Sequence, residues 1–379
     1  MNRKHFLYLV VALVVLGGAG LTLFWQDIAA YRASGAKIGA KLLPGLKIAE
    51  VAEIRLQGPK HQVTLVRKEK NWVVQERGRY PASFEEISDL MIKLVELKVT
   101  QSEQVGASLL PRIELADPGK GEGGGTLVEF RDGAGKVLAG LVLGKTILKK
   151  DPLNPLPAAK DGVPAGRYVR IIGAKDTVVV VSDPLGKATA DPGKWLNKDF
   201  FKADRIRTLA AGREGAAPAW KITRAEEWGQ WRFAGGDGAL DASAAVAAVN
   251  RMGSLSFDDV ALASGKEAAG KPSVIVAETF DNLVYSVRLA ARGKGDDYLV
   301  SFTVKGEPPK ARVPEKGEKP EDGERRDKEF AESRKQLVER VASEQALAKW
   351  TYVIGQRELE PLLKTRSEML ARRRAELRR

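Results

Sequence analysis

An uncharged run of twenty residues, Phe6 to Trp25, constrains the fold of this chain more than any other feature. Twenty helical residues rise about 30 Å, which matches the hydrocarbon core of a bilayer. Aromatic side chains stand near both ends of the run, where they favour the membrane interface. We therefore expect residues 1–26 to form a short tail and a single transmembrane anchor. No later segment is long and apolar enough to predict a second span.

A cleaved signal peptide is the alternative interpretation of this run, because Arg3 and Lys4 precede it as in a secretory signal. The run is longer than a usual signal core. The bulky Leu23-Phe24-Trp25 stands at its end, where a cleavage site would need small residues. These features favour an uncleaved anchor.

The charges around the run bear on its orientation. Arg3 and Lys4 favour a cytoplasmic N-terminus, whereas four basic residues between positions 32 and 47 favour the opposite topology. Long domains are translocated largely regardless of such charges. We therefore expect a single-pass protein of the inner (cytoplasmic) membrane, with its large domain outside the cytoplasm, in the periplasm.

The side chains that most enzymes use are scarce in this chain. Its 379 residues include no cysteine and two histidines, His5 and His61. The lack of cysteine excludes disulfides, thiol nucleophiles, Cys-ligated zinc and iron–sulfur clusters. Two histidines argue against a His-based triad and exclude a multi-His metal site. We predict no catalytic, cofactor-binding or metal-binding residues, and a protein that is not an enzyme.

The rest of the chain predicts an α+β protein built from two tandem repeated units with antiparallel sheets. We expect a juxtamembrane stalk at 27–47, a first unit at 48–203 and a second unit at 204–371. The second unit contains a charged, partly helical insertion at 306–348. Residues 372–379 form a basic tail.

Alternating apolar residues predict the strands of the first unit. A helix begins after Ser83, because Ser83 and Glu86 have the spacing of a capping box in which each side chain bonds the other's amide. The predicted strands are 51–56, 63–67, 72–75, 126–130, 137–143, 168–172 and 177–181.

The internal repeat is visible as short matches in the same order. Trp72 in NWVV corresponds to Trp231 in QWRF, 159 positions later, and both are predicted to pack in a core. The same offset aligns two apolar helix positions of the two units. These pairs are Ile87 with Val246 and Leu90 with Val249. Trp72, Trp220, Trp228 and Trp231 could also line a carbohydrate site, but the recurrence of Trp72 and Trp231 in the repeat favours core packing.

Two glycine-rich segments resemble nucleotide-binding loops in sequence. The segment 140–146 has three residues between its glycines where a phosphate loop needs four, and prolines follow it in place of a helix. We expect the end of a strand and a loop there. The segment 121–125 precedes a strand, which favours a flexible connection over a dinucleotide site.

Carboxylates and the second histidine offer weaker candidates. Pairs such as Asp258-Asp259 and Asp296-Asp297 could serve a hydrolase only if two carboxylates converged in a cleft, and turns are the simpler interpretation. His61 lies in a sequence typical of a hairpin turn.

The insertion combines two kinds of sequence. Lys305 to Lys328 is rich in Lys, Glu, Pro and Gly and is expected to be mobile. Apolar residues then follow at helical spacing, which predicts either a helix packed on the second unit or a partner-binding arm. These residues are Phe330, Leu337, Val338 and Val341.

The chain is basic, with a formal net charge of +13 and six arginines between Arg366 and Arg379. A solvated helix end would explain the tail without any partner. Attraction to anionic lipid headgroups or cell-wall polymers suits the expected location. No nucleic-acid partner is expected, because no recognised module or interleaved aromatic residues accompany the charge.

Short motifs in order resemble the domain-of-unknown-function 4340 family. Tyr80-Pro81-Ala82 resembles the family's aromatic-Pro-Ala step before a helix, and Glu114 stands where a glycine is usual in a later motif. The remaining matches are Ile54-Arg55-Leu56, Val63-Thr64-Leu65, Trp72-Val73-Val74, Leu115-Ala116-Asp117-Pro118, Leu143-Gly144-Lys145, Tyr168-Val169 and Trp195-Leu196.

The resemblance implies a membrane-anchored protein without an established activity, and it carries over no catalytic residues. Relatives in this family often accompany ABC-type transport components of the gliding-motility kind. We therefore expect a non-enzymatic accessory or scaffold subunit of such a transport system. Two alternatives stay open: a binding module for an anionic envelope polymer or lipid surface, and, less favoured, a carboxylate-based envelope hydrolase.

Overall fold

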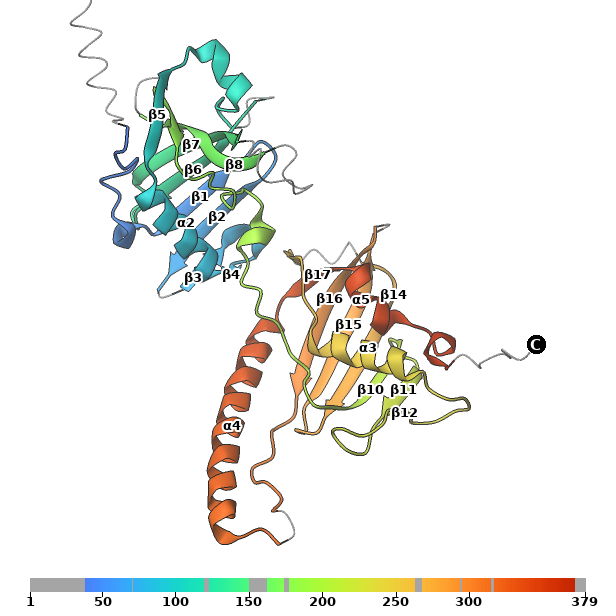
Figure 1. The fold of residues 1–379 in the computed structure, drawn as a ribbon. Helices are drawn as coiled ribbons and strands as arrows, with labels where there is room; N and C mark the ends of the chain where they lie inside the picture. Colours follow the sequence, from blue (N-terminus) through green and yellow to red (C-terminus); the bar gives the residue numbers. More distant parts are fainter. Residues whose placement is uncertain are drawn as a thin grey trace, which may run out of the picture. The chain divides into compact units, whose positions relative to one another are not determined.

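The chain folds as an α+β protein with two antiparallel sheets, and its contacts divide it into two compact units after Trp195 (Figure 1). The computed structural model describes residues 38–69, 71–118, 123–149, 162–173, 177–262, 268–293, 295–314 and 317–371. Within these residues, no helix is both long and apolar enough to cross a bilayer. The predicted span, Phe6 to Trp25, and the basic tail 372–379 lie outside the described residues.

A nine-stranded sheet forms the first unit, in the order β4-β3-β2-β1-β6-β7-β8-β9-β5. Apolar residues at every second position face the helix α2 (Phe84–Glu96), as Ile54 and Leu56 of β1 show by their complete burial. The strands are β1 (Glu53–Gln57), β2 (Gln62–Lys68), β3 (Asn71–Val74), β4 (Tyr80–Pro81), β5 (Val99–Gln104), β6 (Thr126–Arg131), β7 (Val137–Lys149), β8 (Val163–Ile171) and β9 (Thr177–Val181).

The start of α2 follows the expected cap in one half only. The hydroxyl of Ser83 accepts a hydrogen bond from the amide of Glu86, 3.3 Å away. The carboxylate of Glu86 instead binds Lys187, and the amide of Ser83 donates to the carbonyl of Trp195. The expected hydrogen bond from the amide of Ser83 to the carboxylate of Glu86 does not form, because Trp195 binds the amide and Lys187 binds the carboxylate.

The first unit also begins earlier than expected. Leu42 is buried, and its amide donates to the carbonyl of Leu97 at 2.7 Å. The backbone of Gly39 and Ala40 bonds to that of Val99. The C-terminal part of the stalk predicted at 27–47 is therefore packed on the first unit.

Gly140 and Gly144 lie inside β7, where a strand end was predicted. β7 continues beyond Gly144 and pairs with β8 as far as Lys149. A methyl group at Gly144 would overlap the carbonyl oxygen of Ile113 and the side chain of Leu115. The glycine is thus explained by the close approach of another segment to the strand, without any phosphate.

An eight-stranded sheet forms the second unit, in the order β12-β11-β10-β14-β15-β16-β17-β13. An aromatic cluster lies in its core, with the ring of Phe200 centred 4.6 Å from Tyr352 and 5.3 Å from Phe302. The strands are β10 (Ile206–Arg213), β11 (Pro218–Thr223), β12 (Arg232–Phe233), β13 (Asp259–Ala261), β14 (Ala268–Thr279), β15 (Val284–Arg292), β16 (Asp297–Lys305) and β17 (Thr351–Gly355).

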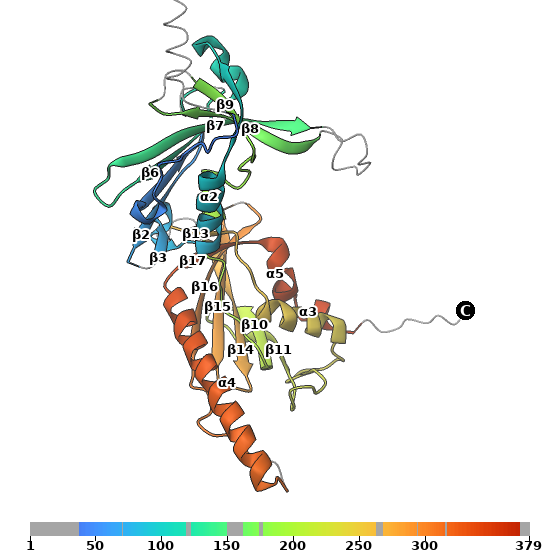
Figure 2. The same cartoon turned by 60° about the vertical axis from the view of Figure 1, so that its left-hand side comes forward.

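The two sheets share one strand order. Reading β10 as the counterpart of β1 makes each strand of the second sheet match a strand of the first, in sequence and in the sheet. The helix α3 (Ala242–Gly253) then corresponds to α2, and α5 (Gln356–Leu363) follows the last paired strand, β17. Figures 1 and 2 show α3 and α5 on the same face of the second sheet.

The helices correspond with an offset one residue smaller than predicted. Asp241 caps α3 as Ser83 caps α2, which gives an offset of 158. Ile87 therefore matches the buried Ala245, and Val246 is 47% exposed. The chain between the tryptophan and the cap is one residue shorter in the second unit, so the predicted alignment of Ile87 with Val246 and of Leu90 with Val249 was wrong by one residue.

The insertion forms a long helix, α4 (Pro320–Leu347), which extends past the end of the second sheet (Figures 1 and 2). Its C-terminal end packs on the unit through Val341 and Glu344, which are 6% and 2% exposed. Val338, predicted on the packed face, is 41% exposed. The helix begins within the stretch expected to be mobile, because Arg312 binds Glu318 and Asp327, each at 2.6 Å.

Candidate binding cleft on the second unit

A cleft of about 590 Å³ opens on the second unit beside α3. Three segments form its walls: the residues that lead into β10, the loop between β11 and β12, and the C-terminal half of α3. The lining residues are Ala203, Asp204, Arg205, Ile206, Arg224, Glu227, Trp228, Trp231, Val246, Val249, Asn250, Gly253 and Ser254.

The helix contributes an apolar wall to the cleft. Val246, Val249, Asn250 and Gly253 follow at the i, i+3, i+4, i+7 spacing that places residues on one helical face. A separate stripe that includes Ala245, Ala248 and Met252 packs in the core. α3 therefore has a second face outside the core, on which two valines stand beside Asn250 and Gly253.

The loop contributes two indole rings and a cation. The guanidinium of Arg224 lies 4.8 Å from the ring of Trp231 and 5.7 Å from that of Phe280. Its Nε donates to the carbonyl of Ile206 at 2.8 Å, and a second nitrogen donates to the carbonyl of Glu227. Burial lowers the pKa of Arg224. This stack fixes the loop, which presents Trp228 with its side chain 92% exposed.

Ion pairs close the base of the cleft. Arg205 has a φ of +50°, a strained value for a residue with a side chain. Its guanidinium binds both oxygens of Glu227, at 3.0 and 2.8 Å, and also pairs with Asp281. The hydrogen bond from Arg205 lowers the pKa of Glu227, whereas burial raises that of Asp281. These pairs hold Arg205 in its unusual conformation.

The groups in the cleft suit binding better than acid–base chemistry. Glu227 is ionised and held at both oxygens by Arg205, and Asp204 binds Arg340 at 2.6 Å. Neither carboxylate is therefore free to take up or release a substrate proton. In the part of the chain that the structure describes, no group of three or more His, Asp or Glu side chains is arranged to hold a metal ion.

Of the four tryptophans considered for a carbohydrate site, two are buried and two line the cleft. Trp72 and Trp220 are buried in the cores, 5% and 1% exposed, and Trp220 donates to the carbonyl of Lys364. Trp228 and Trp231 line the cleft. Trp231 is half-buried although its counterpart Trp72 is buried, so the core prediction holds for one of the pair and is wrong for the other.

Other residues singled out from sequence have structural positions. His61 is exposed in the turn between β1 and β2, where its carbonyl accepts from the amide of Gly58 at 2.9 Å. Asp258 and Asp296 each stand at a bend just before a strand. The structure does not bring these carboxylates into the cleft.

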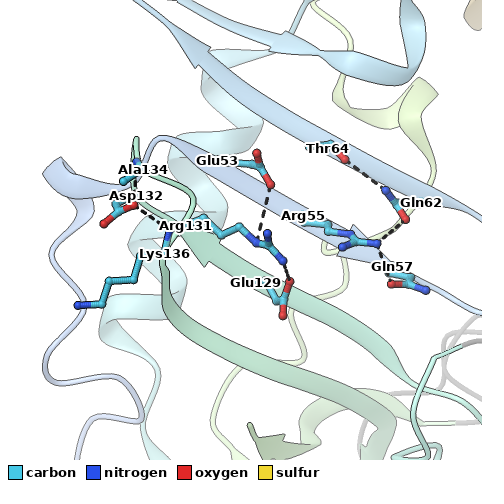
Figure 3. Close-up of polar contacts among 10 residues, drawn as sticks. All are labelled: Glu53, Arg55, Gln57, Gln62, Thr64, Glu129, Arg131, Asp132, Ala134 and Lys136. Atoms are coloured by element: carbon cyan, nitrogen blue, oxygen red, sulfur yellow. Dashed lines mark hydrogen bonds and ion pairs between the residues drawn. The ribbon is translucent and has the colours of Figure 1, made fainter. Parts of the chain in front are cut away.

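The outer face of the first sheet carries a second group of polar side chains (Figure 3). Arg131 lies between Glu129, at 2.8 Å, and Glu53, at 3.9 Å. Arg55 donates to Gln62 at 3.0 Å and to Gln57 at 3.4 Å. Neighbouring carboxylates thus match the positive charge of Arg131, whereas the side-chain partners of Arg55 are neutral amides.

Comparison with known proteins adds no relative to this description. No protein-family model, no curated protein and no solved structure matches the chain.

Proposed function

We propose that this protein is a membrane-anchored accessory subunit that works outside the cytoplasm and binds a partner in a transport complex of the inner membrane. It is a binding protein and not an enzyme. The cleft on the second unit is the observation that carries this proposal, because it offers an exposed indole and an apolar helix face while its charged groups are held in internal pairs. The run Phe6 to Trp25 supplies the anchor.

Two further features support the proposal. The matching strand orders favour two repeats of one unit, and one copy has gained a cleft and the helix α4. The sequence resemblance to the domain-of-unknown-function 4340 family points to transport components of the ABC type as the partner. Duplication followed by divergence is a common origin for a binding surface on a scaffold whose sheets are retained.

Binding of an anionic envelope polymer or lipid surface is the second candidate. The net charge of +13 favours it. Such binding should weaken strongly as salt screens the charges. The internal pairing of Arg205 and Arg131 weakens this alternative, because neither cation is left to meet a phosphate or carboxylate without losing a partner.

Co-purification from the native membrane tests the proposal. The tagged full-length protein is crosslinked in cells, extracted in mild detergent and captured, with the same tag on an unrelated single-span anchor as the control. We expect membrane subunits of a transporter in the sample and not in the control. Recovery of the protein alone, or with envelope polymer that salt releases, would contradict the proposal.

A further inference from the structure

We infer that the cleft binds an uncharged, apolar segment of a protein partner, with Trp228 and the valines of α3 as its anchors. This inference rests on the proposed function as a partner-binding subunit and goes beyond it by naming the site and the chemistry of its occupant.

The apolar surface of the cleft is the first argument. Trp228 is 92% exposed and Val246 is 47% exposed, and both face the same space as the partly buried Val249 and Trp231. An exposed tryptophan beside apolar side chains is typical of the residues that dominate protein–protein binding. Gly253 lies on the same face of the helix, one turn beyond Val249, and has no side chain to fill the cleft.

The charge balance is the second argument. Two arginines and two carboxylates line the cleft, and the carboxylates are both paired: Glu227 with Arg205, and Asp204 with Arg340. Arg224 stacks against Trp231 and bonds to two carbonyls. A charged ligand would have to break one of these ion pairs to form its own, or enter the cleft without forming an ion pair. The site therefore favours a segment without charge.

The supply of hydrogen-bonding groups is the third argument, and it separates a peptide from a saccharide. A neutral sugar offers many hydroxyls that need directional partners, as polar groups in binding sites provide. Within the described part of the chain, the side-chain amide of Asn250 and the indole N–H groups of Trp228 and Trp231 have no hydrogen-bonding partner, whereas the charged groups of the lining are engaged. These few groups are enough for the main chain of a short peptide segment, whereas a sugar ring needs partners for several hydroxyls at once.

Selection of peptides tests the inference without knowing the partner. The full-length protein in lipid nanodiscs is used to select from a phage-displayed library of random peptides, with the Val246→Glu variant for counter-selection. We expect peptides with aliphatic or aromatic residues and no net charge. Their synthetic forms should lose at least about tenfold in affinity for Trp228→Ala and for Val246→Glu.

A matched variant controls for the added charge. Val313 is 90% exposed and lies outside the cleft, so Val313→Glu makes the same change at a distant surface. It should leave peptide affinity unchanged. Because Trp228 is nearly fully exposed, Trp228→Ala removes the anchor without removing a core residue.

Several results would overturn the inference. These are the absence of enriched peptides, enrichment of acidic or basic peptides, equal loss of affinity in Val313→Glu, or stronger binding of a neutral oligosaccharide such as chitohexaose at the same cleft. The proposed function fails separately. If the protein selects apolar peptides but co-purifies no transporter, the cleft assignment stands and the proposed function fails. If it co-purifies a transporter through another surface, the proposed function stands and the cleft assignment fails.

Discussion

Glu344 shows how one buried residue anchors a long exposed helix. It is 2% exposed, and it accepts hydrogen bonds from the hydroxyl of Tyr285 at 2.8 Å and from the amide of Lys202 at 3.0 Å. Arg340 on the preceding turn lies 3.6 Å from the same carboxylate. These contacts attach the C-terminal end of α4 to the second unit.

The stability of the second unit should depend on pH through this carboxylate. Burial raises the pKa of Glu344 above its ordinary value of 4.5. The folded state therefore binds the proton more tightly than the unfolded state, and the free energy of unfolding falls as pH rises from about 4.5 through the raised pKa. Glu344→Gln should reduce that fall, although the similarly raised pKa of Asp281 leaves part of it.

Urea unfolding between pH 4.5 and pH 8 measures this dependence. Glu358→Gln is the control, because Glu358 also pairs with an arginine of the second unit, Arg251, but its side chain is 37% exposed. The interpretation fails if Glu344→Gln and the unchanged protein lose the same free energy over this range.

Gly144 gives a second prediction at the scale of one residue. Gly144→Ala places a methyl group against the carbonyl oxygen of Ile113 and the side chain of Leu115, so we expect a loss of about 1–3 kcal/mol in the free energy of unfolding. Gly186→Ala is the control, because a methyl group there meets no atom within 4 Å. Equal stabilities of the two variants would refute the close-approach explanation.

At the scale of elements, alternation and capping were enough to predict most of the first unit. The strands β1, β2, β3, β6 and β9 and the helix α2 lie close to their predicted positions, whereas β8 begins at Val163, before the predicted start at Tyr168. The strand β5 was not predicted, because VTQSEQ has no apolar alternation and five of its six side chains are exposed at the sheet edge. Pairing with β9, and not side-chain pattern, makes this segment a strand.

The cleft could not be predicted, because it depends on which apolar residues the core leaves out. α2 fills its core with Ile87, Leu90 and Leu94, whereas α3 uses two alanines and Met252 at the matching positions. The valines of α3 belong to the other stripe, and a shift of one residue in the alignment moves them from core to surface. The sequence held one signal for the cleft, Trp228, because no tryptophan stands at the equivalent position of the first unit.

The helix α4 should have two parts of different stability. Its C-terminal end is held by Val341 and Glu344 in the core, whereas its N-terminal part is held at the surface by Arg312, which binds Glu318, Asp327 and the carbonyl of Gly323. We expect Arg312→Ala to speed amide hydrogen exchange at 320–328 and to leave exchange at 341–347 unchanged.

Hydrogen exchange read by mass spectrometry over these two segments tests the division. Lys310→Ala removes an exposed basic side chain from the same segment and should change neither rate. A uniform rise along the whole of α4 in Arg312→Ala would show that the helix opens as one unit and would contradict this account.

At the scale of the molecule, two units of the same strand order have different surfaces. The first presents a polar sheet face with ion pairs around Arg131, and the second presents the cleft beside α3 and the projecting helix α4. We therefore propose that the partner contacts the second unit.

Site-specific photocrosslinking in the native membrane tests this central claim most directly. A photoreactive phenylalanine analogue replaces Trp228 in the full-length protein, and the same analogue at Val313 serves as the control, because both sites are almost fully exposed. We predict a crosslink from position 228 to an apolar segment of a transporter subunit, and none from position 313. Absence of a crosslink at 228, or the same products from both positions, would contradict it.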